Sequence, residues 1–353
     1  MKKNRIKKCL KLIEKTGLDA LLLSSPSNIR YLSGFRQAEG YLLLNPYENI
    51  YFTNFIYAEE AEEISLWKTK LVKENLFEAV AKGAKNLGIK KLGFEAKHLT
   101  FLEYKLLKKC VTNRNINFVK TTDLVADLRS IKDEKEIKFI KEATKITLQG
   151  FEFVEELIDS GLSEKQISLE LEKFLKLKGD NKVAFPPIVA FGRNSSVPHH
   201  LPCGQRLGRD KMSLIDSGAM SSGYCSDLTR IFFSGKIPIH MKKIYDLIKK
   251  AQSLAIKKIK PGLEAKELDR AARDLIEKNK MGRYFGHGLG HGIGISVHEK
   301  PFLNPYNREV LKENMVLTIE PAVYLPGKFG IRLESIVIIR KNGAEVIDGD
   351  SYR

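Results

Sequence analysis

Cysteine is scarce in this sequence. The 353 residues include four cysteines, and no two of them form a Cys-x-x-Cys pair. Their positions are Cys9, Cys110, Cys203 and Cys225. Thiols this far apart in a chain of this length do not suggest a disulfide framework. We therefore expect a reducing compartment and predict a cytoplasmic protein.

The sequence also lacks a long apolar run. No stretch of about eighteen apolar residues, the minimum for a transmembrane helix, occurs in it. The first segment, MKKNRIKKCLKLIEK, is basic but has neither the apolar core nor the cleavage site of a signal peptide. Its apolar residues Ile6, Leu10 and Ile13 recur at helical spacing, so it could lie on an anionic membrane or pack on its own domain. We favour packing and predict no membrane partner.

Acidic residues are outnumbered by basic ones. The chain has 60 Lys and Arg against 43 Asp and Glu, which gives a formal charge of +17. Such a charge can indicate a polyanionic partner, an acidic substrate or a lysine-rich proteome. The lysines are spread from Lys2 to Lys341 in small groups, without a basic stripe interleaved with aromatic residues. We predict no nucleic-acid partner, with a non-catalytic protein- or RNA-binding module as an alternative.

The length of the chain favours two domains, because single hydrophobic cores stop growing near this size. Residues 18–125 alternate short apolar runs with helical stretches near 55–65, 76–87 and 100–110. The runs typical of strands are LDALLLSS, YLLLN, NIYFT and KLGFE. We predict an α/β (α+β) protein with an N-terminal α/β domain over 1–127 and a second domain over 128–353.

A highly charged stretch from Arg129 to Ile158 follows the first domain. Its apolar positions recur every three to four residues, at Ile137, Ile140, Ala143, Ile146 and Thr147. This spacing predicts a long exposed helix with Asp133 as its N-cap. Further helices are expected up to Lys178, around 238–259 and around 264–279, within β-rich sequence that Gly and Pro punctuate.

Two acid pairs lie in strongly apolar strands on either side of a turn. In MSLIDSGAMSSGYCSDLTRIFF, a symmetric hairpin places Asp216 opposite Asp227. In VLTIEPAVYLPGKFGIRLESIVII, a hairpin centred on Gly327 places Glu320 opposite Glu334. Facing carboxylates in apolar strands repel each other, so positive charge should lie between them.

Two sources of that positive charge are open. The nearby Arg230 and Arg332 could form ion pairs with the acids. Four carboxylates also fit a pair of hard or borderline cations, because two-metal hydrolases use bridging carboxylates to hold the ions that polarise a water. We favour two divalent metal ions.

Nitrogen ligands are available in FGHGLGHGIGISVHEKP, where His287, His291 and His298 stand among glycines. The glycines disfavour a helix, so we expect a loop. A nitrogen ligand would favour manganese, cobalt, zinc or iron over magnesium. A further pair, His199 and His200, stands in VPHHLP.

Taken in order, these motifs resemble those of the pita-bread metallopeptidases: methionine aminopeptidase, aminopeptidase P and prolidase. The motifs are DSG, then SDLTR, HGxGH with a histidine seven positions on, EP, and RLE, and they lie within about 130–353. Residues 1–125, with NIRYLSGF, resemble the creatinase-type N-terminal domain of aminopeptidase P and prolidase. The resemblance implies a creatinase-like domain followed by a pita-bread catalytic domain. It favours an Xaa-Pro peptidase over a methionine aminopeptidase, which stays an alternative.

The resemblance also implies a ligand set. Asp216 would chelate one metal ion, and His291 would bind the other together with Glu320. Asp227 and Glu334 would bridge both ions. All five residue types are present, which argues against the members of the fold that have no metal.

Catalytic roles follow from the same resemblance. Glu320 would also act as general base for the water held by the metals. His298 and His199 would hydrogen-bond the scissile carbonyl and the developing gem-diolate. His287 would lie on the substrate side of the pocket.

The family places its histidine directly after the proline of VPHHLP, which selects His199 and leaves His200 without a role. Arg332 would orient Glu334 or a neighbouring acid. The implied substrates are proline-containing dipeptides or short peptides, cleaved at the Xaa-Pro bond by a homodimer.

Overall fold

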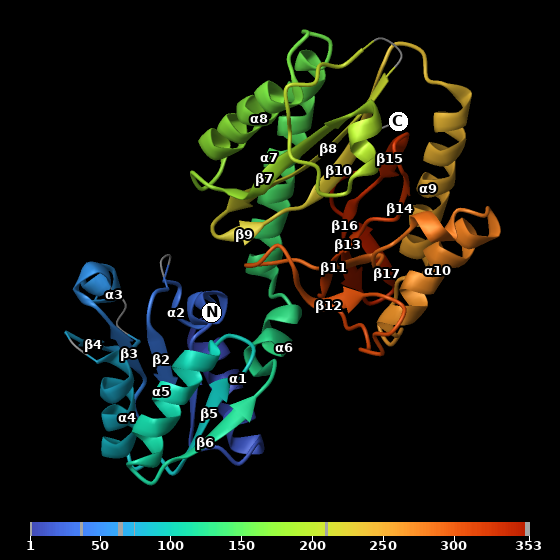
Figure 1. The fold of residues 1–353 in the computed structure, drawn as a ribbon. Coiled ribbons are helices and arrows are strands. Elements are labelled where there is room, and N and C mark those ends of the chain that lie inside the picture. The colour runs from blue at the N-terminus through green and yellow to red at the C-terminus, as the bar shows by residue number, and fades with distance from the viewer. Residues whose placement is uncertain (1, 36–37, 63–65, 74, 209–210, 350–353) are drawn as a thin grey trace. The chain divides into compact units, whose positions relative to one another are not determined.

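The computed structural model describes residues 2–35, 38–62, 66–73, 75–208 and 211–349 (Figure 1). The chain separates into two compact units, residues 1–129 and 130–353, called unit 1 and unit 2 below. The structure is mixed α/β, as the sequence predicts. Among the described helices, none combines the length and the apolar character that crossing a membrane requires.

Unit 1 is built on a six-stranded sheet with strand order β4-β3-β2-β1-β5-β6. Its strands are β1 (Ala20–Leu23), β2 (Tyr41–Leu44), β3 (Ile50–Thr53), β4 (Lys68–Leu71), β5 (Lys91–Glu95) and β6 (Asn117–Thr121). Strands β1, β5 and β6 are parallel, whereas β2 is antiparallel to both of its neighbours. The four strand-like runs of the sequence thus become β1, β2, β3 and β5, which confirms their prediction.

The helices expected near 55–65, 76–87 and 100–110 are present in unit 1, whereas those at 26–33 and 124–130 were not expected. The helices of unit 1 are α1 (Lys2–Lys15), α2 (Pro26–Ser33), the short η1 (Phe55–Tyr57) and α3 (Ala58–Glu62), α4 (Leu76–Asn86), α5 (Phe101–Thr112) and α6 (Leu124–Ser130). Ile6 and Ile13 of α1 are buried, so this helix packs on its own unit as expected. Residues 63–65, at the end of one predicted helix, lie outside the described residues.

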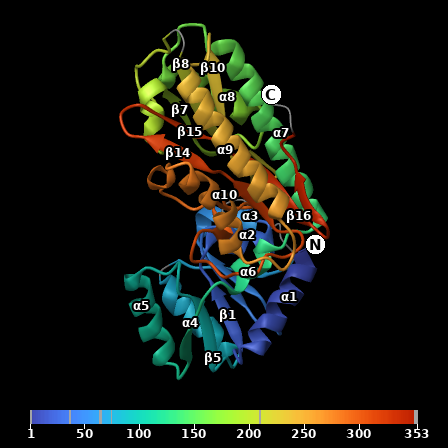
Figure 2. The ribbon, with the colours of Figure 1, turned by 90° about the vertical axis from the view of Figure 1, so that its right-hand side faces the viewer.

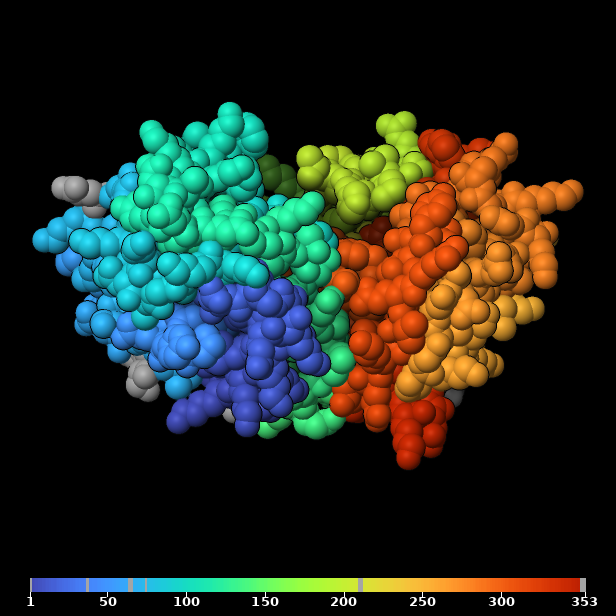
Figure 3. Space-filling view, turned by 90° about the horizontal axis from the view of Figure 1, so that it is seen from below, coloured from blue at the N-terminus to red at the C-terminus, as the bar shows by residue number. Residues whose placement is uncertain are grey.

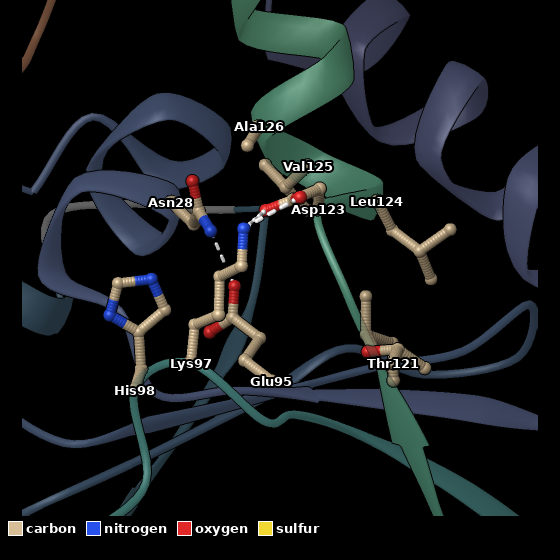
Figure 4. A pocket seen from close by; sticks show the side chains of 10 residues that line it. Asn28, Glu95, Lys97, His98, Thr121, Asp123, Leu124, Val125 and Ala126 are labelled. Atoms are coloured by element: carbon tan, nitrogen blue, oxygen red, sulfur yellow. Dashed lines mark hydrogen bonds and ion pairs between the residues drawn. The ribbon is translucent and has the colours of Figure 1, made fainter. Parts of the chain in front are cut away.

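A buried carboxylate fixes the start of α2, which carries the NIRYLSGF motif. Glu95, only 8% exposed at the end of β5, accepts hydrogen bonds from the backbone N–H groups of Ser24 (2.7 Å) and Ser25 (2.8 Å). The side-chain amide of Asn28 also donates to Glu95, and Figure 4 shows these two side chains facing each other. Arg129 donates to Asn28 Oδ1 at 2.8 Å. This network connects Arg129, at the end of unit 1, to the first turn of α2.

Unit 2 contains four long helices and several sheets. The helices are α7 (Glu134–Leu157), α8 (Glu164–Lys178), α9 (Ile239–Lys258) and α10 (Ala265–Lys278), with the short η2 (Gly192–Ser196) and η3 (Gly282–Tyr284). The strands are β7 (Val183–Phe191), β8 (Lys211–Ser221), β9 (Tyr224–Cys225), β10 (Leu228–Ser234), β11 (Gly290–Gly292), β12 (Glu299–Leu303), β13 (Val316–Ile319), β14 (Ala322–Leu325), β15 (Phe329–Arg332), β16 (Ser335–Arg340) and β17 (Gly343–Val346). Sheet order is β10-β8-β7 and β12-β11-β13-β16-β17, and β14 pairs with β15.

The core of unit 2 has two apolar layers on opposite faces of β16. Ile336 and Ile338 join the cluster formed with α7 and α8, whereas Val337 and Ile339 join the cluster formed with α9 and α10. Successive side chains of a strand point to opposite faces, so β16 is covered by helices on both sides. Figure 2 shows α9 lying in front of the strands that it covers. The acids of the candidate site lie on β8 and in the two-residue breaks after β9, β13 and β15.

Helix α7 begins as the sequence predicts but is less exposed. The Asp133 carboxylate accepts from the Glu136 N–H, and the Glu136 carboxylate accepts from the Asp133 N–H, both at 2.9 Å. This capping box confirms the N-cap. The apolar stripe that includes Ile137 and Ile140 is buried against the sheet, so the expectation of an exposed helix is wrong for that face. The high proportion of charged residues in this segment is what led to the expectation of an exposed helix.

Replacing Asp133 tests the capping box. Asp133→Ala should lower the free energy of unfolding of unit 2 by about 1 kcal/mol, because the N–H of Glu136 loses its acceptor. Asp133→Ser keeps an accepting oxygen and should retain most of that stability. Urea denaturation followed by circular dichroism would measure both. Equal losses in the two variants would contradict the cap as the source of the effect.

Candidate active site

The first acid hairpin differs in register from the sequence prediction. In the ladder between β8 and β10, Asp216 pairs with Thr229, so its expected pairing with Asp227 is wrong. The turn lies at residues 222–223, both with positive φ (49° and 79°), and such a two-residue turn matches the twist of a hairpin. The same register places Asp227 opposite Gly218, two residues from Asp216 along β8. Residues two apart share a face, so both acids still lie on one side of the hairpin.

The second acid hairpin confirms its predicted register. Strands β14 and β15 pair Ala322 with Arg332. Gly327, with φ of 68°, lies at the centre of the turn. Continuing this register by two residues brings Glu320 opposite Glu334. The two hairpins thus each direct an acid pair into the same pocket.

The predicted histidines enter this pocket from two segments. Residues 285–298 contain no helix, as the glycines predict, and His291 lies on the short strand β11. Its Nε2 atom is 3.4 Å from Glu320 Oε1 and 3.6 Å from Asp227 Oδ2. The ring of His298 lies 4.2 Å from that of His291, centroid to centroid. His199, from the loop after η2, lines the same cavity.

The cavity has a volume of about 520 Å³ and contains all nine residues predicted for the site. They are His199, Asp216, Asp227, His287, His291, His298, Glu320, Arg332 and Glu334. In Figure 3 the surface of unit 2 is hollowed between the yellow-green segment near residue 200 and the orange segment near residue 300. Segments distant in the sequence therefore converge on one cavity.

Within the cavity, three overlapping groups of side chains have the geometry to hold metal ions. Each group offers ligand atoms that all lie within 4.8 Å of one another. The groups are Asp216, Asp227 and Glu334; His291, Glu320 and Glu334; and Asp227, His291 and His298. Shared acids between groups are what two neighbouring cations would require.

The ionised forms of three of these acids are strongly destabilised. Burial, followed by repulsion from neighbouring carboxylates, holds the pKa of Asp227 and that of Glu334 well above their ordinary values. Burial likewise raises the pKa of Glu320 to about 8. Asp216 Oδ1 and Glu334 Oε1 are buried atoms without a hydrogen-bond partner. Oxygen atoms left unpaired in this way fit a cation, which would satisfy them and offset the repulsion.

Arg332 supplies part of the missing positive charge. It donates to Asp216 Oδ2 at 2.5 Å, to Thr229 Oγ1 at 2.8 Å and to the Tyr324 hydroxyl at 2.6 Å. Thr229 in turn donates to Glu334 Oε2 at 2.8 Å, so Arg332 reaches Glu334 through a hydroxyl and contacts Asp216 directly. One guanidinium cannot balance four acids.

Arg230, the other arginine considered, is directed elsewhere. Its guanidinium pairs with Asp348 at 2.6 Å and donates to the backbone carbonyl of Glu334. The interpretation in which Arg230 and Arg332 together neutralise the four acids is therefore not supported. The unpaired acid oxygens therefore still fit a divalent cation.

Tyr324 is a residue of the pocket that the sequence analysis missed. Its hydroxyl accepts from Arg332 and lies 3.3 Å from His287 Nε2. Tyr324 follows Glu320 by four positions in a strand-rich segment, so the alternation of side chains could have identified it. It connects Arg332 of the acid cluster to His287.

A polar pair on α10 holds the loop that carries His287, and sequence analysis missed it too. Asp269, fully buried, accepts from the N–H of Leu289 at 3.0 Å and pairs with Arg273 at 2.7 Å. Arg273 donates to the backbone carbonyls of Phe285 (3.0 Å) and His287 (2.7 Å). The one sequence signal was an Asp and an Arg four residues apart on an amphipathic helix, a spacing that is common on exposed surfaces. Only the fold shows that this pair faces inward.

His200 is not incidental, contrary to its reading from the sequence. Its Nε2 atom lies 2.8 Å from Oε2 of Glu164, the first residue of α8. Glu164 is fully buried and also accepts from the N–H of Phe191 (2.7 Å) and from the side-chain amide of Asn194 (2.9 Å). These bonds hold the segment 192–205, which presents His199 to the cavity.

Comparison with known proteins agrees with this geometry. Residues 138–341 match the model of metallopeptidase family M24, and residues 5–131 match the creatinase/prolidase N-terminal domain. A Xaa-Pro dipeptidase of Pyrococcus horikoshii is 36% identical over 344 residues, which cover 97% of this chain and 95% of that protein.

Two solved structures are similar over nearly the whole chain. A Xaa-Pro dipeptidase from Bacillus anthracis has a TM-score of 0.94 and 34% identity, covering 100% of this chain and 99% of that one. An X-Pro aminopeptidase from Thermotoga maritima has a TM-score of 0.86 and 32% identity, covering 95% and 97%. The chain therefore belongs to metallopeptidase family M24 and carries the creatinase/prolidase N-terminal domain in front of its peptidase domain.

Proposed function

We propose that the protein hydrolyses the Xaa-Pro bond at the N-terminus of dipeptides or short peptides, as a Xaa-Pro dipeptidase or a Xaa-Pro aminopeptidase. The observation that carries this proposal is the convergence of four acids, three of them buried, and His291 on one cavity, with two acid oxygens lacking partners. The names of the similar proteins supply the substrate class. The preserved acids argue against a non-catalytic binding module.

The proposed ligand set divides the five residues between two divalent ions. Asp216 would hold one ion, His291 and Glu320 the other, and Asp227 and Glu334 both. Four carboxylates with one imidazole suit manganese, cobalt, zinc or iron. When bound, such ions act as Lewis acids that polarise a carbonyl and lower the pKa of a water.

The surrounding side chains have separate proposed roles. Glu320 takes the proton of the attacking water, and His199 and His298 donate hydrogen bonds to the scissile carbonyl oxygen. Burial lowers the pKa of His287 to about 4, so this ring is neutral near pH 7 and can contact an uncharged part of the substrate. Arg332 positions Asp216 directly.

The cavity wall supports a substrate with a proline ring. Pro198, Phe302, Leu303 and Tyr324 line it beside the acid cluster. The proline nitrogen of an Xaa-Pro bond carries no hydrogen and its ring fixes φ, so a shaped apolar wall can recognise it without a hydrogen bond.

The proposal also includes the domain bounds 1–127 and 128–353, a homodimer and a cytoplasmic location. The four free cysteines support the location.

A peptide panel tests the activity. Chelator-stripped protein resupplied with manganese, cobalt or zinc should cleave Ala-Pro and leave Met-Ala largely intact. Cleavage of Ala-Pro-Ala would identify an aminopeptidase, and its resistance a dipeptidase; released amino acids are quantified by chromatography. Preference for Met-Ala, or no metal-dependent cleavage of any proline peptide, would refute the proposal.

Metal binding can be tested without an activity assay. Adding Mn²⁺ to the stripped protein at 100 times its Kd should stabilise it against unfolding by about 2.7 kcal/mol. Asp227→Asn should lose most of this stabilisation. The metal-free variant should be at least as stable as the metal-free wild type, because one repelling carboxylate is gone.

Thermal unfolding with and without Mn²⁺ measures the two effects. Asp246→Asn, the same change at an exposed position of α9, is the matched control and should respond to Mn²⁺ as the wild type does. An unaltered metal response in Asp227→Asn would remove Asp227 from the ligand set.

Arg273→Lys tests the clamp on the loop of His287. Lysine keeps a charge beside Asp269 but cannot donate to two carbonyls in the same way, so the loop should shift. We expect kcat on Ala-Pro to fall by up to about 100-fold, the effect of a displacement of about 1 Å. Bound metal, measured by atomic emission, should stay unchanged. Arg270→Lys, at an exposed position of the same helix, is the control, and equal effects of the two variants would contradict the positioning role.

A further inference from the structure

A second group of metal-ligating side chains lies outside the acid cluster. Glu164, His200 and Cys203 each offer one ligand atom, and these atoms all lie within 4.8 Å of one another. His200 Nε2 is 2.8 Å and Cys203 Sγ is 3.0 Å from the same atom, Glu164 Oε2. The backbone N–H of Cys203 also donates to this oxygen at 3.1 Å, so three polar groups of residues 200–203 converge on one carboxylate oxygen.

The group is held in place by backbone hydrogen bonds. The N–H of Glu164 donates to the carbonyl of Gln205 (2.9 Å), and the N–H of Lys165 donates to the carbonyl of Cys203 (3.0 Å). The chain on both sides of the three side chains is thus fixed before any ligand binds. Preorganised donors lose little conformational freedom when a ligand orders them.

The carboxylate of the group is ionised. Burial acts to raise its pKa, but hydrogen bonds from the Phe191 N–H and from Cys203, His200 and Asn194 together lower the pKa of Glu164 below its ordinary value. Cys203 is exposed, so a cation could enter from solvent. The side chain of His200 is 15% exposed and that of Glu164 is fully buried.

We propose that Glu164, His200 and Cys203 form a separate site for a thiophilic divalent cation of the zinc or cadmium type. Carboxylate, imidazole and thiolate are ligands that Zn²⁺ accepts, and water from the exposed side would complete a tetrahedron. The cation would connect the first turn of α8 to the segment 192–205. Because His199 belongs to that segment, the site would restrain a residue of the catalytic cavity without contacting the acid cluster. The inference does not depend on the proposed peptidase activity.

The side chains of His200 and Cys203 would have to move only slightly away from Glu164 to bind a zinc ion. In tetrahedral zinc coordination, neighbouring oxygen, nitrogen and sulfur ligands lie about 3.3–3.6 Å apart. The hydrogen-bonded group would therefore open by roughly 0.5 Å at each contact. Binding replaces the thiol proton of Cys203, which is released to solvent as the sulfur–metal bond forms. The affinity of the site for the cation should therefore weaken as the pH falls.

Cadmium absorption distinguishes this site from the acid cluster. The cluster offers only oxygen and nitrogen atoms, so a thiolate-to-cadmium charge-transfer band in the ultraviolet reports a sulfur ligand. Titrating chelator-stripped full-length protein with Cd²⁺ should produce this band to saturation. Cys203→Ser, which keeps a hydrogen-bond donor toward Glu164, should abolish it, whereas Cys110→Ser should retain it. Thermal unfolding confirms that each variant is folded.

His200→Gln separates a built site from an exposed thiol acting alone. Its affinity for Cd²⁺, measured through the same band, should fall by about 10–100-fold, as when even outer partners of a metal ligand are lost. A wild type without the band, a band that persists in Cys203→Ser, or an unchanged affinity in His200→Gln would each overturn the proposal.

Discussion

Repulsion among four clustered carboxylates, three of them buried, is the constraint on which the rest of unit 2 depends. An unpaired carboxylate is costly to bury, and burial followed by repulsion from neighbouring acids raises the pKa of Asp227 and that of Glu334. A fold accepts such a cost only where something compensates for it. Here the compensation comes from Arg332 and, in our proposal, from two cations. The repulsion that destabilises the cluster without metal is therefore the same interaction that favours the binding of cations.

The scaffold keeps the acids together against this repulsion. Asp216 lies on β8, and the other three acids lie in two-residue breaks between strands whose backbone hydrogen bonds leave little freedom. Helices cover both faces of β16. Arg332 of the second hairpin donates to Thr229 and Asp216 of the first and so connects the two hairpins. Rigid strands suit a site that must hold like charges at short range, because any relaxation would separate them. The glycine-rich segment then adds His291 from β11, with the ring of His298 beside it.

The histidines, in contrast, are held from outside the acid cluster. Arg273 fixes the backbone at His287, and Glu164 fixes the segment that presents His199. Both supports are charged residues of a helix, Glu164 fully buried and Arg273 partly buried, and each holds the backbone of a loop. The adjacent residues His199 and His200 consequently face different surroundings, one the cavity and the other the start of α8. The positions of His199 and His287 can therefore change without a change in the acid cluster.

The sequence by itself determined the acids, the histidines, the strand and helix types and the two-unit organisation, because these follow from residue chemistry and local periodicity. It also determined the second hairpin, since Gly327 marks its turn. Tertiary structure decided the register of the first hairpin, where the turn at Ser222 depends on a backbone conformation that composition does not reveal. It alone decided which charged residues are buried: an Asp and an Arg on α10 look like a solvated pair until the fold turns them inward. Burial is a property of packing between distant segments, and no local pattern specifies it.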